Sequence, residues 1–571
     1  MKRIIFFTYF IFIITLSFAQ GSGVENTTKI HQTEKIPIYD NQGVLITNTD
    51  YVEPVTVDIF PTNLKNVSNT SLSATVNITA GGLQSTLSTT ELKSITNLII
   101  KGSIDARDFK TMRDSMTVLS DVDFSEALIM EYHGNKGTND TITTLYPANE
   151  IPVYAFGSKS YGNGNHKLHS INISITTRSI GNSAFQYCTV LSSMNIVSSV
   201  VSIGNSAFYD CQGFTSFYIP AAVTYIGHSA FIGINCSISV DSGNTTFSDI
   251  NGILFNKDQS TLIKYPTNFG GSYTIPITVD SISNLAFFGC RSLTDVIIPT
   301  SVSYLGDQAF SYCNVLTNLF IPSSVLSMGS YVFMSSSCMI TVDNNNPNFS
   351  STDGVLFNKL KTKLIQCPTS KTGIYDIPAS VNSLAYMAFQ NCTGLTTVTI
   401  PPTISNIVYS SFYGCTGLTS MTIPSSVINI GSMAFYNCSG LTTLYSPSPN
   451  PVVLSSTSNV FFNVNKSTCT LYVPIGSKAN YQSATLWEDF QNIVEAATDL
   501  KTVDQSEIKV TVDNGKLIVQ YAVKGIKIEI YSISGQNIKE QLIENYQTEI
   551  PLPKGIYILR IGNYSDKVVI K

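Results

Sequence analysis

The sequence predicts a mainly β protein in which a solenoid of 23-residue turns is followed by a small C-terminal β-sandwich. One observation is a phenylalanine, mostly preceded by Ala, that returns every 23 residues in groups of three. The groups comprise Phe185, Phe208 and Phe231, then Phe287, Phe310 and Phe333, and then Phe389, Phe412 and Phe435. A second observation is that corresponding members of successive groups are 102 residues apart. A third is a run of short alternating apolar segments after residue 507. Internal periodicity of this kind indicates stacked repeats.

Each 23-residue unit contains two short apolar stretches. In the unit that begins at Phe412, the apolar positions are Leu418, Met421, Ile423, Val427 and Ile430, and Gly431 follows them. The Leu-x-x-Met-x-Ile and Val-x-x-Ile patterns predict two short strands on opposite walls of the turn, with Gly relieving the tight corner after the second strand. One unit cannot bury its apolar stripe alone, so stacking is expected to bury a continuous core.

Two gaps of 56 residues interrupt the 23-residue spacing, and each holds an inserted segment. The two copies span 238–266 and 340–368, and both contain Leu-Phe-Asn-Lys, around Phe255 and Phe357. Apolar runs that flank an Asn-Lys turn predict a β-hairpin added to the turn. At a strand spacing of about 4.8 Å, about twelve turns would form a rod of roughly 60 Å.

The repeat resembles a known family. The string Ile-Pro-Ser-Ser-Val-x-x-Ile-Gly-x-x-Ala-Phe-x-x-Cys over 423–438 resembles the BspA-type (Treponema-type) leucine-rich repeat, and the inserts are similar to inserts of that family. Segments that begin at Asn77, Ile104 and Tyr146 resemble its N-terminal cap, and those at Cys469 and Trp487 resemble its C-terminal cap. The resemblance covers residues 76–496 and implies a solenoid that serves attachment, with partners that differ among family members.

The N-terminus has the pattern of a secretory signal peptide. Lys2 and Arg3 precede an apolar run over 4–16, and the small residues Ser17 and Ala19 fit a signal-peptidase site, which predicts cleavage before Gln20. A membrane anchor is the alternative, but the run is short for a bilayer span. No later apolar run is long enough to cross a membrane, so the mature chain is expected to have no transmembrane span.

Residues 497–571 differ from the repeats, because Lys and Glu return and Cys is absent. Alternating segments over 508–512, 516–520, 526–531 and 555–561 predict the small β-sandwich. The patterns Ile-Glu-Ile-Tyr, Gly-x-Tyr-x-Leu and a terminal Lys-Val-Val-x-Lys resemble a type IX secretion sorting domain. That resemblance implies recognition by the type IX secretion machinery, passage through the outer membrane, usual removal of the tail, and surface attachment or release. An ordinary accessory β-domain is the alternative.

These patterns predict the following organisation. A signal peptide (1–19) is followed by an N-terminal segment or linker (20–75), an N-terminal cap with the first atypical repeats (76–175), the leucine-rich-repeat solenoid (176–446), a C-terminal cap (447–496) and the sorting domain (497–571).

Eleven cysteines in an exported chain first suggest a disulfide framework. Seven of them, however, lie three residues after a repeat phenylalanine. Stacked turns hold such side chains parallel, whereas a disulfide needs a dihedral angle close to about 90°. The sequence therefore predicts a ladder of buried free thiols.

No catalytic, cofactor-binding or metal-binding set is recognisable, so the chain is not expected to be an enzyme. No Glu occurs between residues 151 and 487, and no Cys-x-x-Cys pair occurs. Asp121-x-Asp123-x-Ser125 begins like a calcium loop but lacks its required Gly and Glu, which favours a strand of the cap. His166 and His169 flank Leu168, an expected inward position, with a metal-binding pair as the minor alternative. His228 is expected on the solvated surface.

The outward positions of the first strand of each turn form three columns. Two columns are mostly Thr and Ser, which suit exposed strands. The third contains Tyr218, Ile297, Phe320 and Tyr445. Exposed aromatic residues favour contact with proteins or glycans, although packing against a neighbouring loop is the alternative.

The predicted function is that of an exported protein, secreted or on the outer cell surface. It is expected to bind or adhere to proteins of a host, a matrix or other cells. A secreted glycan-binding or glycan-degrading accessory protein is the alternative, and a structural coat protein without a specific ligand is the third hypothesis. The net charge of −5 provides no basic footprint for nucleic acid, so nucleic acid is not an expected partner.

Overall fold

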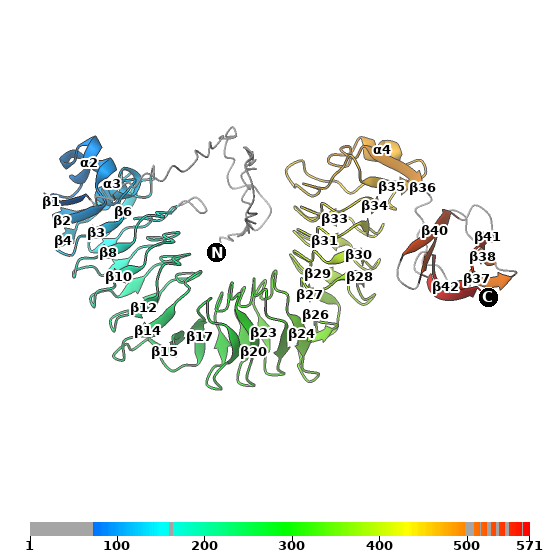
Figure 1. Cartoon of the computed structure of the whole chain (residues 1–571), viewed down its shortest axis with the longest axis horizontal. Coiled ribbons are helices and arrows are strands. Elements are labelled where there is room, and N and C mark those ends of the chain that lie inside the picture. Colours follow the sequence, from blue (N-terminus) through cyan, green and yellow to red (C-terminus); the bar gives the residue numbers. More distant parts are fainter. Residues whose placement is uncertain are drawn as a thin grey trace, which may run out of the picture. The chain divides into compact units, whose positions relative to one another are not determined.

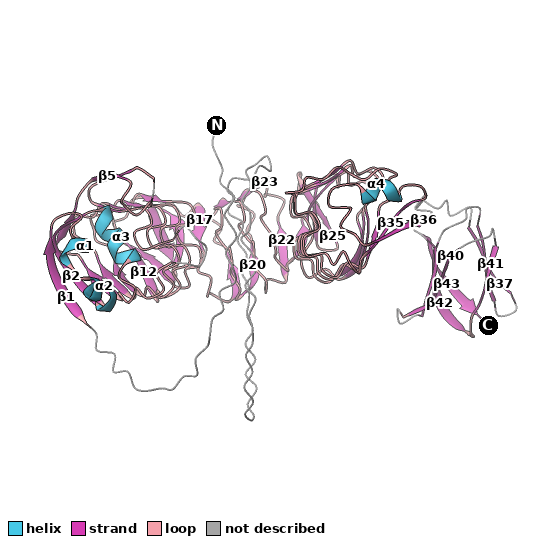
Figure 2. Cartoon of the chain, turned by 90° about the horizontal axis from the view of Figure 1, so that it is seen from above, coloured by secondary structure: helices cyan, strands magenta, loops and turns pink. Residues whose placement is uncertain are grey.

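The computed structural model describes residues 72–140, 142–158 and 164–496, and the segments 508–513, 516–521, 527–532, 536–542, 547–561 and 564–570. The predicted signal peptide and residues 20–71 of the predicted N-terminal segment lie outside the described residues. The protein is mainly β with about 5% helix, as the sequence predicts. Figures 1 and 2 show a solenoid whose helices lie at its two ends.

The N-terminal end of the solenoid is built from short strands and three helices. Their bounds are β1 (Ser73–Ile78), α1 (Leu83–Thr86), α2 (Thr89–Ser94), β2 (Asn97–Ile104), α3 (Ala106–Asp114), β3 (Asp121–Asp123), β4 (Ala127–Ile129), β5 (Tyr132–Gly134) and β6 (Thr144–Tyr146). Helix α3 begins with a capping box in which Asp105 and Asp108 satisfy each other's backbone N–H groups. Its Phe109 packs edge-on against Phe124 and Phe156, with ring centroids 5.5 and 6.1 Å apart. The first turns are thereby closed by a helix.

The Leu-x-x-Met-x-Ile stretches form a wall of parallel strands, which we call wall one. Its strands after β3 are β8 (Ser170–Asn172), β10 (Ser193–Asn195), β12 (Ser216–Ile219), β14 (Ser237–Val240), β18 (Gly271–Thr274), β20 (Leu293–Ile297), β22 (Asn318–Ile321), β24 (Met339–Val342), β28 (Gly373–Asp376), β30 (Leu395–Thr399), β32 (Ser420–Thr422), β34 (Thr443–Tyr445), β35 (Thr470–Pro474) and β36 (Asn492–Ala496). Strands of successive turns pair in register, so the same template position recurs along the wall.

The Val-x-x-Ile stretches form the opposite wall, wall two. Its two-residue strands are β7 (Glu150–Ile151), β9 (Ser179–Ile180), β11 (Ser202–Ile203), β13 (Tyr225–Ile226), β19 (Ser281–Ile282), β21 (Tyr304–Leu305), β23 (Ser327–Met328), β29 (Ser383–Leu384), β31 (Asn406–Ile407) and β33 (Asn429–Ile430). The first apolar side chain of each wall-one stretch and the Ile or Leu of wall two are buried against each other as the continuous core.

The two inserts contain the predicted antiparallel hairpins, β15 (Phe247–Ile250) with β16 (Ile253–Asn256), and β25 (Phe349–Thr352) with β26 (Val355–Asn358). Each hairpin continues into a third strand, β17 (Thr261–Lys264) or β27 (Lys363–Gln366), which joins wall two. Tyr265 then takes the place of a repeat phenylalanine, because its N–H donates to Ala286 O at 2.9 Å and its ring stacks 5.0 Å from Phe287. Each 56-residue gap therefore holds two turns, and the array has about 18 turns, not the predicted twelve.

The repeat phenylalanine stands at the centre of a third ladder between turns. Around Phe185, the backbone N–H groups of residues 183, 185 and 187 each donate to a carbonyl of the next turn at 2.8 Å. The buried rings stack on one another, for example Phe185 on Phe208 at 5.3 Å and Phe412 on Phe435 at 5.4 Å. Each turn is thus bonded to its neighbours on three sides.

The reason predicted for the repeat glycine is wrong. Gly204 does not have positive φ, whereas the residues two before and two after each repeat phenylalanine do, such as Ser206 (53°) and Asp210 (57°). A Cβ on Gly204 would instead lie 2.7 Å from the backbone N of Asn182 and 2.8 Å from the carbonyl carbon of Gly181. Glycine is required there because the neighbouring turn approaches closely.

All eleven cysteines are buried and free, which confirms the predicted ladder of thiols. Cys211, Cys313 and Cys438 donate through Sγ to the carbonyl of the phenylalanine one turn earlier, at 3.0, 3.1 and 3.1 Å. Burial raises the pKa of Cys188, Cys290 and Cys438 to about 12. The thiols therefore serve packing and hydrogen bonding inside the solenoid.

The C-terminal end of the solenoid is closed by aromatic side chains. Phe461 continues the phenylalanine ladder at 5.7 Å from Phe435 and contacts Trp487 at 5.1 Å. Trp487 is fully buried and donates its indole N–H to Val452 O at 2.9 Å. The short helix α4 (Lys478–Gln482) lies beside these residues and supplies the buried Tyr481.

The described C-terminal strands form two antiparallel sheets. One contains β37 (Ile508–Asp513), β38 (Lys516–Tyr521) and β41 (Gln547–Pro551), and the other contains β39 (Lys527–Ser532), β40 (Asn537–Leu542), β42 (Gly555–Ile561) and β43 (Tyr564–Ile570). Apolar residues of both sheets share one buried cluster. The sandwich itself stays a prediction, because several connecting segments lie outside the described residues. No helix in the described part of the chain is long and apolar enough to cross a membrane.

The buried thiols predict a loss of stability at high pH. A thiol that titrates near 8.5 when unfolded and near 12 when folded stabilises the fold fully below about pH 8.5, and this stabilisation is lost as the pH rises toward 12. We expect the thermal midpoint to fall steadily between pH 8.5 and 11, and less steeply in Cys438→Ala. Circular dichroism melts would measure it, and equal slopes for both proteins would contradict the assignment.

The close approach of neighbouring turns predicts that Gly204→Ala is destabilising. The added methyl group must push apart two backbone segments, which costs about 1–3 kcal/mol. Gly243→Ala is the matched control, because its Cβ would meet only side-chain atoms, the nearest being Asp241 Oδ1 at 3.2 Å. Urea denaturation should show a lower midpoint for Gly204→Ala alone. Similar midpoints for the two variants would overturn the explanation.

Candidate binding surface

The four residues predicted as a binding surface all lie on wall one, but they do not form one patch. Tyr218 belongs to β12, Ile297 to β20, Phe320 to β22 and Tyr445 to β34. Wall one is divided into separate sheets between β10 and β12 and at the two inserts, and these strands fall into three of the sheets. Only Ile297 and Phe320 are on adjacent strands of one sheet.

Ile297 and Phe320 form an exposed apolar pair. The pairing of Val296 with Leu319 places the two residues side by side on the outer face of neighbouring strands. Ile297 is 51% exposed and Phe320 is 49% exposed. The flanking positions in the row are Thr274 and Thr341. Elsewhere on this wall, such outward positions are often occupied by Thr or Ser. The two apolar side chains are therefore a candidate contact point.

Tyr218 is held in place by the next turn. Its hydroxyl donates to a carboxylate oxygen of Asp241, which follows β14. This hydrogen bond raises the pKa of Tyr218 and lowers the pKa of Asp241. The ring is 48% exposed, so its face is free while its hydroxyl is fixed. The face of the Tyr218 ring is therefore exposed, as expected for a contact residue. Its hydroxyl contacts a neighbouring loop, which is part of the alternative.

Tyr445 has a partner that was not predicted from the sequence. Tyr472 of β35 lies directly beside it in register, and the two rings stack with centroids 4.9 Å apart. Val494 of β36, 41% exposed, pairs with Tyr472 on the other side. Tyr445 is half-buried, and burial raises its pKa. The alternation of Leu471, Tyr472 and Val473 was the available signal, because it places Tyr472 outward.

The histidines and acids of the early turns occupy structural positions. Leu168 is fully buried as predicted, whereas His166 and His169 are exposed and bond separately, to Thr189 Oγ1 at 3.0 Å and to Lys167 O at 2.7 Å. Asp121 and Asp123 lie in β3, and Asp123 accepts from Ser125 N at 2.9 Å. His228 is exposed. No cluster of three or more potential metal ligands occurs among the described residues.

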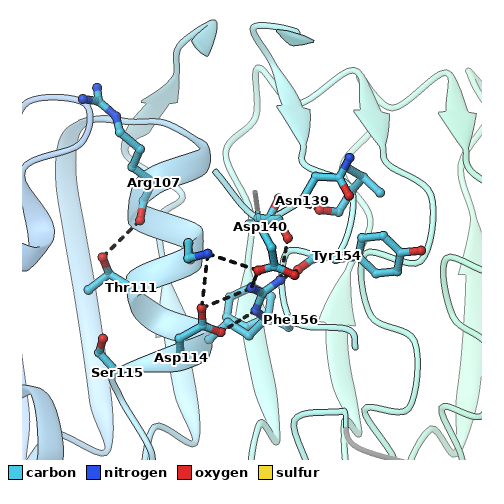
Figure 3. A network of polar contacts seen from close by, with 12 residues as sticks. Arg107, Thr111, Asp114, Ser115, Asn139, Asp140, Tyr154 and Phe156 are labelled. Atoms are coloured by element: carbon cyan, nitrogen blue, oxygen red, sulfur yellow. Dashed lines mark hydrogen bonds and ion pairs between the residues drawn. The ribbon is translucent and has the colours of Figure 1, made fainter. Parts of the chain in front are cut away.

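A charged network on α3 also has a structural role. Arg113 donates to the carbonyl groups of Thr138 and Tyr154 at 2.8 and 2.9 Å. Its second nitrogen and Lys110 Nζ both contact Asp140 Oδ1 at 3.1 Å (Figure 3). Because these bonds end on backbone carbonyls and on paired carboxylates, the network ties the loop between β5 and β6 and the turn after β7 to the helix.

The comparisons with known proteins agree with this architecture. A family model described as BspA type leucine rich repeat region matches residues 150–273, 270–376 and 370–486 in six copies. A second model, described as a domain of unknown function, matches residues 497–570. No curated protein matched the chain.

Several solved bacterial structures are similar to the solenoid. A leucine-rich repeat protein from Eubacterium ventriosum is 21% identical and has a TM-score of 0.38, with 63% of this chain and 92% of that one covered. A leucine rich cell surface protein from Faecalibacterium prausnitzii is 24% identical with a TM-score of 0.34, and the match covers 62% and 84% of the two chains. A leucine-rich repeat protein from Bacteroides ovatus is 22% identical with a TM-score of 0.26, and the match covers 62% and 89%.

The family model spans more than half of the chain and ends at residue 486, close to the end of the solenoid. It covers the repeat phenylalanines and both inserts, which are the features that generate the fold. The chain therefore belongs to the BspA type leucine rich repeat family.

Proposed function

We propose that this chain is exported and acts on the outer cell surface as a protein-binding scaffold that attaches to proteins of a host, a matrix or other cells. The family assignment supports a binding scaffold. The main supporting observation on the molecule is the exposed pair Ile297 and Phe320 on the regular face of wall one. Burial of such a pair under a partner would remove apolar surface from water at the centre of a contact.

The regularity of the wall supports this assignment of the pair. The positions 102 residues after Ile297 and Phe320 are occupied by Thr399 and Thr422, in strands with the same pairing. The fold therefore accepts Thr at these sites, and stacking of the turns does not require an apolar residue there. Contact with a partner would account for the apolar residues at positions 297 and 320.

A double variant, Ile297→Thr with Phe320→Thr, tests the surface. It copies the later block, so the melting temperature should be unchanged. Binding of the purified protein to immobilised extracellular-matrix proteins or whole cells should weaken by about tenfold or more, since two apolar anchors are lost. Thr399→Ala with Thr422→Ala is the matched control and should bind normally. Unchanged binding by the Ile297 and Phe320 variant would reject this face.

The same measurements separate protein binding from the alternative of glycan binding. Arrays of glycans and of matrix proteins would be probed with the same protein. Signal on glycans alone would favour a glycan-binding accessory protein, with the stacked Tyr445 and Tyr472 as the next surface to vary. Signal on neither array, together with normal surface display, would favour a structural coat component.

We also propose that residues 497–571 direct export through the type IX secretion machinery. A chain that ends after Ala496, the last residue of β36, keeps the whole solenoid. It should fold but stay in the periplasm, whereas the full chain should reach the cell surface. Fractionation and surface labelling would show the difference. Surface display of the shortened chain would contradict the proposal and leave an accessory β-domain.

A further inference from the structure

The first turns of the solenoid contain a strand that departs from the regular stack. Strand β4 pairs with the C-terminal end of β2, whereas β3 pairs with both β2 and β8. The backbone of the following turns reaches β4 through Asn149, whose N–H donates to Ile129 O at 2.9 Å and whose carbonyl accepts from the Arg178 N–H at 2.7 Å. A groove of about 560 Å³ lies at this corner, lined by residues of β4 and of the turn after β8. We call it the corner groove.

Three of the apolar side chains that line the corner groove are exposed. Leu128 and Met130 are 51% and 44% exposed, and Ile175, from the turn after β8, is 74% exposed. Single exposed apolar residues are common on protein surfaces, whereas three that line one groove mark a contact surface. The repeat does not require an isoleucine at this place, because Ser198 holds the same position one turn later.

Arg178 is the one charged side chain among the described residues that line the corner groove. It is exposed, and its guanidinium has no hydrogen-bond or ion-pair partner in the described structure. The carboxylate of Glu150 is bonded elsewhere, because it accepts from Ser179 Oγ at 2.8 Å. The fold does not require a cation here either, since Val201 holds the same position one turn later and Asp280 holds it 102 residues later.

The Asn149 carboxamide is a second polar group of the corner groove without a partner. Its side chain is half-buried, and neither its oxygen nor its nitrogen makes a hydrogen bond within the described structure. A ligand that covers the groove must bond this group, because burying an unpaired amide is costly. A peptide backbone can do so, since it carries both N–H and C=O groups, whereas an acyl chain carries neither.

We infer that the corner groove binds an extended peptide segment of a partner protein, with apolar side chains and an acidic side chain on the same face. Residues two apart in an extended chain point to one side, so such a segment meets the groove with both kinds of side chain at once. The apolar side chains cover Leu128, Met130 and Ile175, and the carboxylate forms paired hydrogen bonds with the Arg178 guanidinium. This site goes beyond the proposed face at Ile297 and Phe320, because it requires a charge in its partner.

Fluorescence anisotropy with the full chain and a labelled peptide, Glu-Ser-Leu-Ser-Leu-Ser-Glu, tests this site. The peptide places both leucines and both glutamates on one face and is the same in either chain direction. It should bind saturably, and the version with Gln in place of Glu should bind about tenfold more weakly because it lacks the charge. The version with Lys should not bind. No saturable binding of the Glu peptide, or equal binding of the Glu and Gln peptides, would overturn the inference.

The repeat provides variants that have a precedent in this fold. Arg178→Asp copies Asp280, and Ile175→Ser copies Ser198, so both proteins should keep their melting temperature. Each should bind the Glu peptide about tenfold more weakly or worse, and Arg178→Asp should bind the Lys peptide instead. Ile277→Ser is the matched control, because Ile277 holds the position of Ile175 in the second block and is 67% exposed. Full binding of the Glu peptide by both groove variants would reject the site.

An anionic lipid has the same combination of apolar and acidic groups, so vesicles of phosphatidylglycerol form a second arm of the experiment. Co-sedimentation should leave the protein in the supernatant, because a membrane surface cannot bond the Asn149 carboxamide inside the corner groove. Binding to vesicles that Arg178→Asp abolishes, without binding of the Glu peptide, would assign the groove to lipid and overturn the inference.

The two proposed surfaces can be tested separately. Ile297 and Phe320 lie on β20 and β22, whereas the corner groove is lined by β4 and the turn after β8. Ile297→Thr with Phe320→Thr should therefore leave binding of the Glu peptide unchanged. Arg178→Asp should leave unchanged the part of matrix-protein binding that the Ile297 and Phe320 variant removes. Failure of one assignment can thus be recognised without failure of the other.

Discussion

The backbone contact between successive turns at the repeat phenylalanine is the interaction on which the solenoid depends. At Phe185 the N–H bonds forward to Ala207 O, and the carbonyl receives the Cys188 N–H and the Cys211 thiol. The ring stacks on the next ring at the same place. This geometry leaves space only for a short thiol beside the carbonyl and for glycine where the backbone of the next turn approaches, which accounts for the conserved spacing of Phe, Cys and Gly within this chain.

The contact between successive turns restricts which residues are accepted at buried positions more than at surface positions. A change at a rung position affects two neighbours, because each turn contacts the turns before and after it. Outward positions of wall one are not enclosed between two turns, so Thr, Tyr, Ile and Phe all occur in one column without disturbing the stack. Residues of different chemical types therefore occur on the outer face, and the exposed pair Ile297 and Phe320 is an example.

The backbone contact between successive turns is interrupted at the two inserts. Their hairpins bring an additional turn into the array, and in wall two β13 does not pair with β17 and β23 does not pair with β27. The backbone no longer dictates the side chains there, so two copies of the same arrangement hold different contents. Tyr386 and Tyr409 contact each other at the second insert, whereas a cleft lined by small residues such as Ser229 and Asn284 remains at the first.

Local alternation repeated at a fixed period was enough to predict the mainly β solenoid, the 23-residue turn, the hairpins, the inward and outward positions and the buried thiols. The turns centred on Tyr265 and Cys367 were not predicted, because neither central residue is Phe; the N–H of Cys367 donates to Ala388 O as that of Tyr265 donates to Ala286 O. The reason why the repeat glycine is required was not predicted either. The stack of Tyr445 on Tyr472 and the cleft beside the first insert also depend on residues far apart in the chain. These features follow from the tertiary structure, because register between turns and the interruption of the backbone ladder bring together side chains that no local pattern relates.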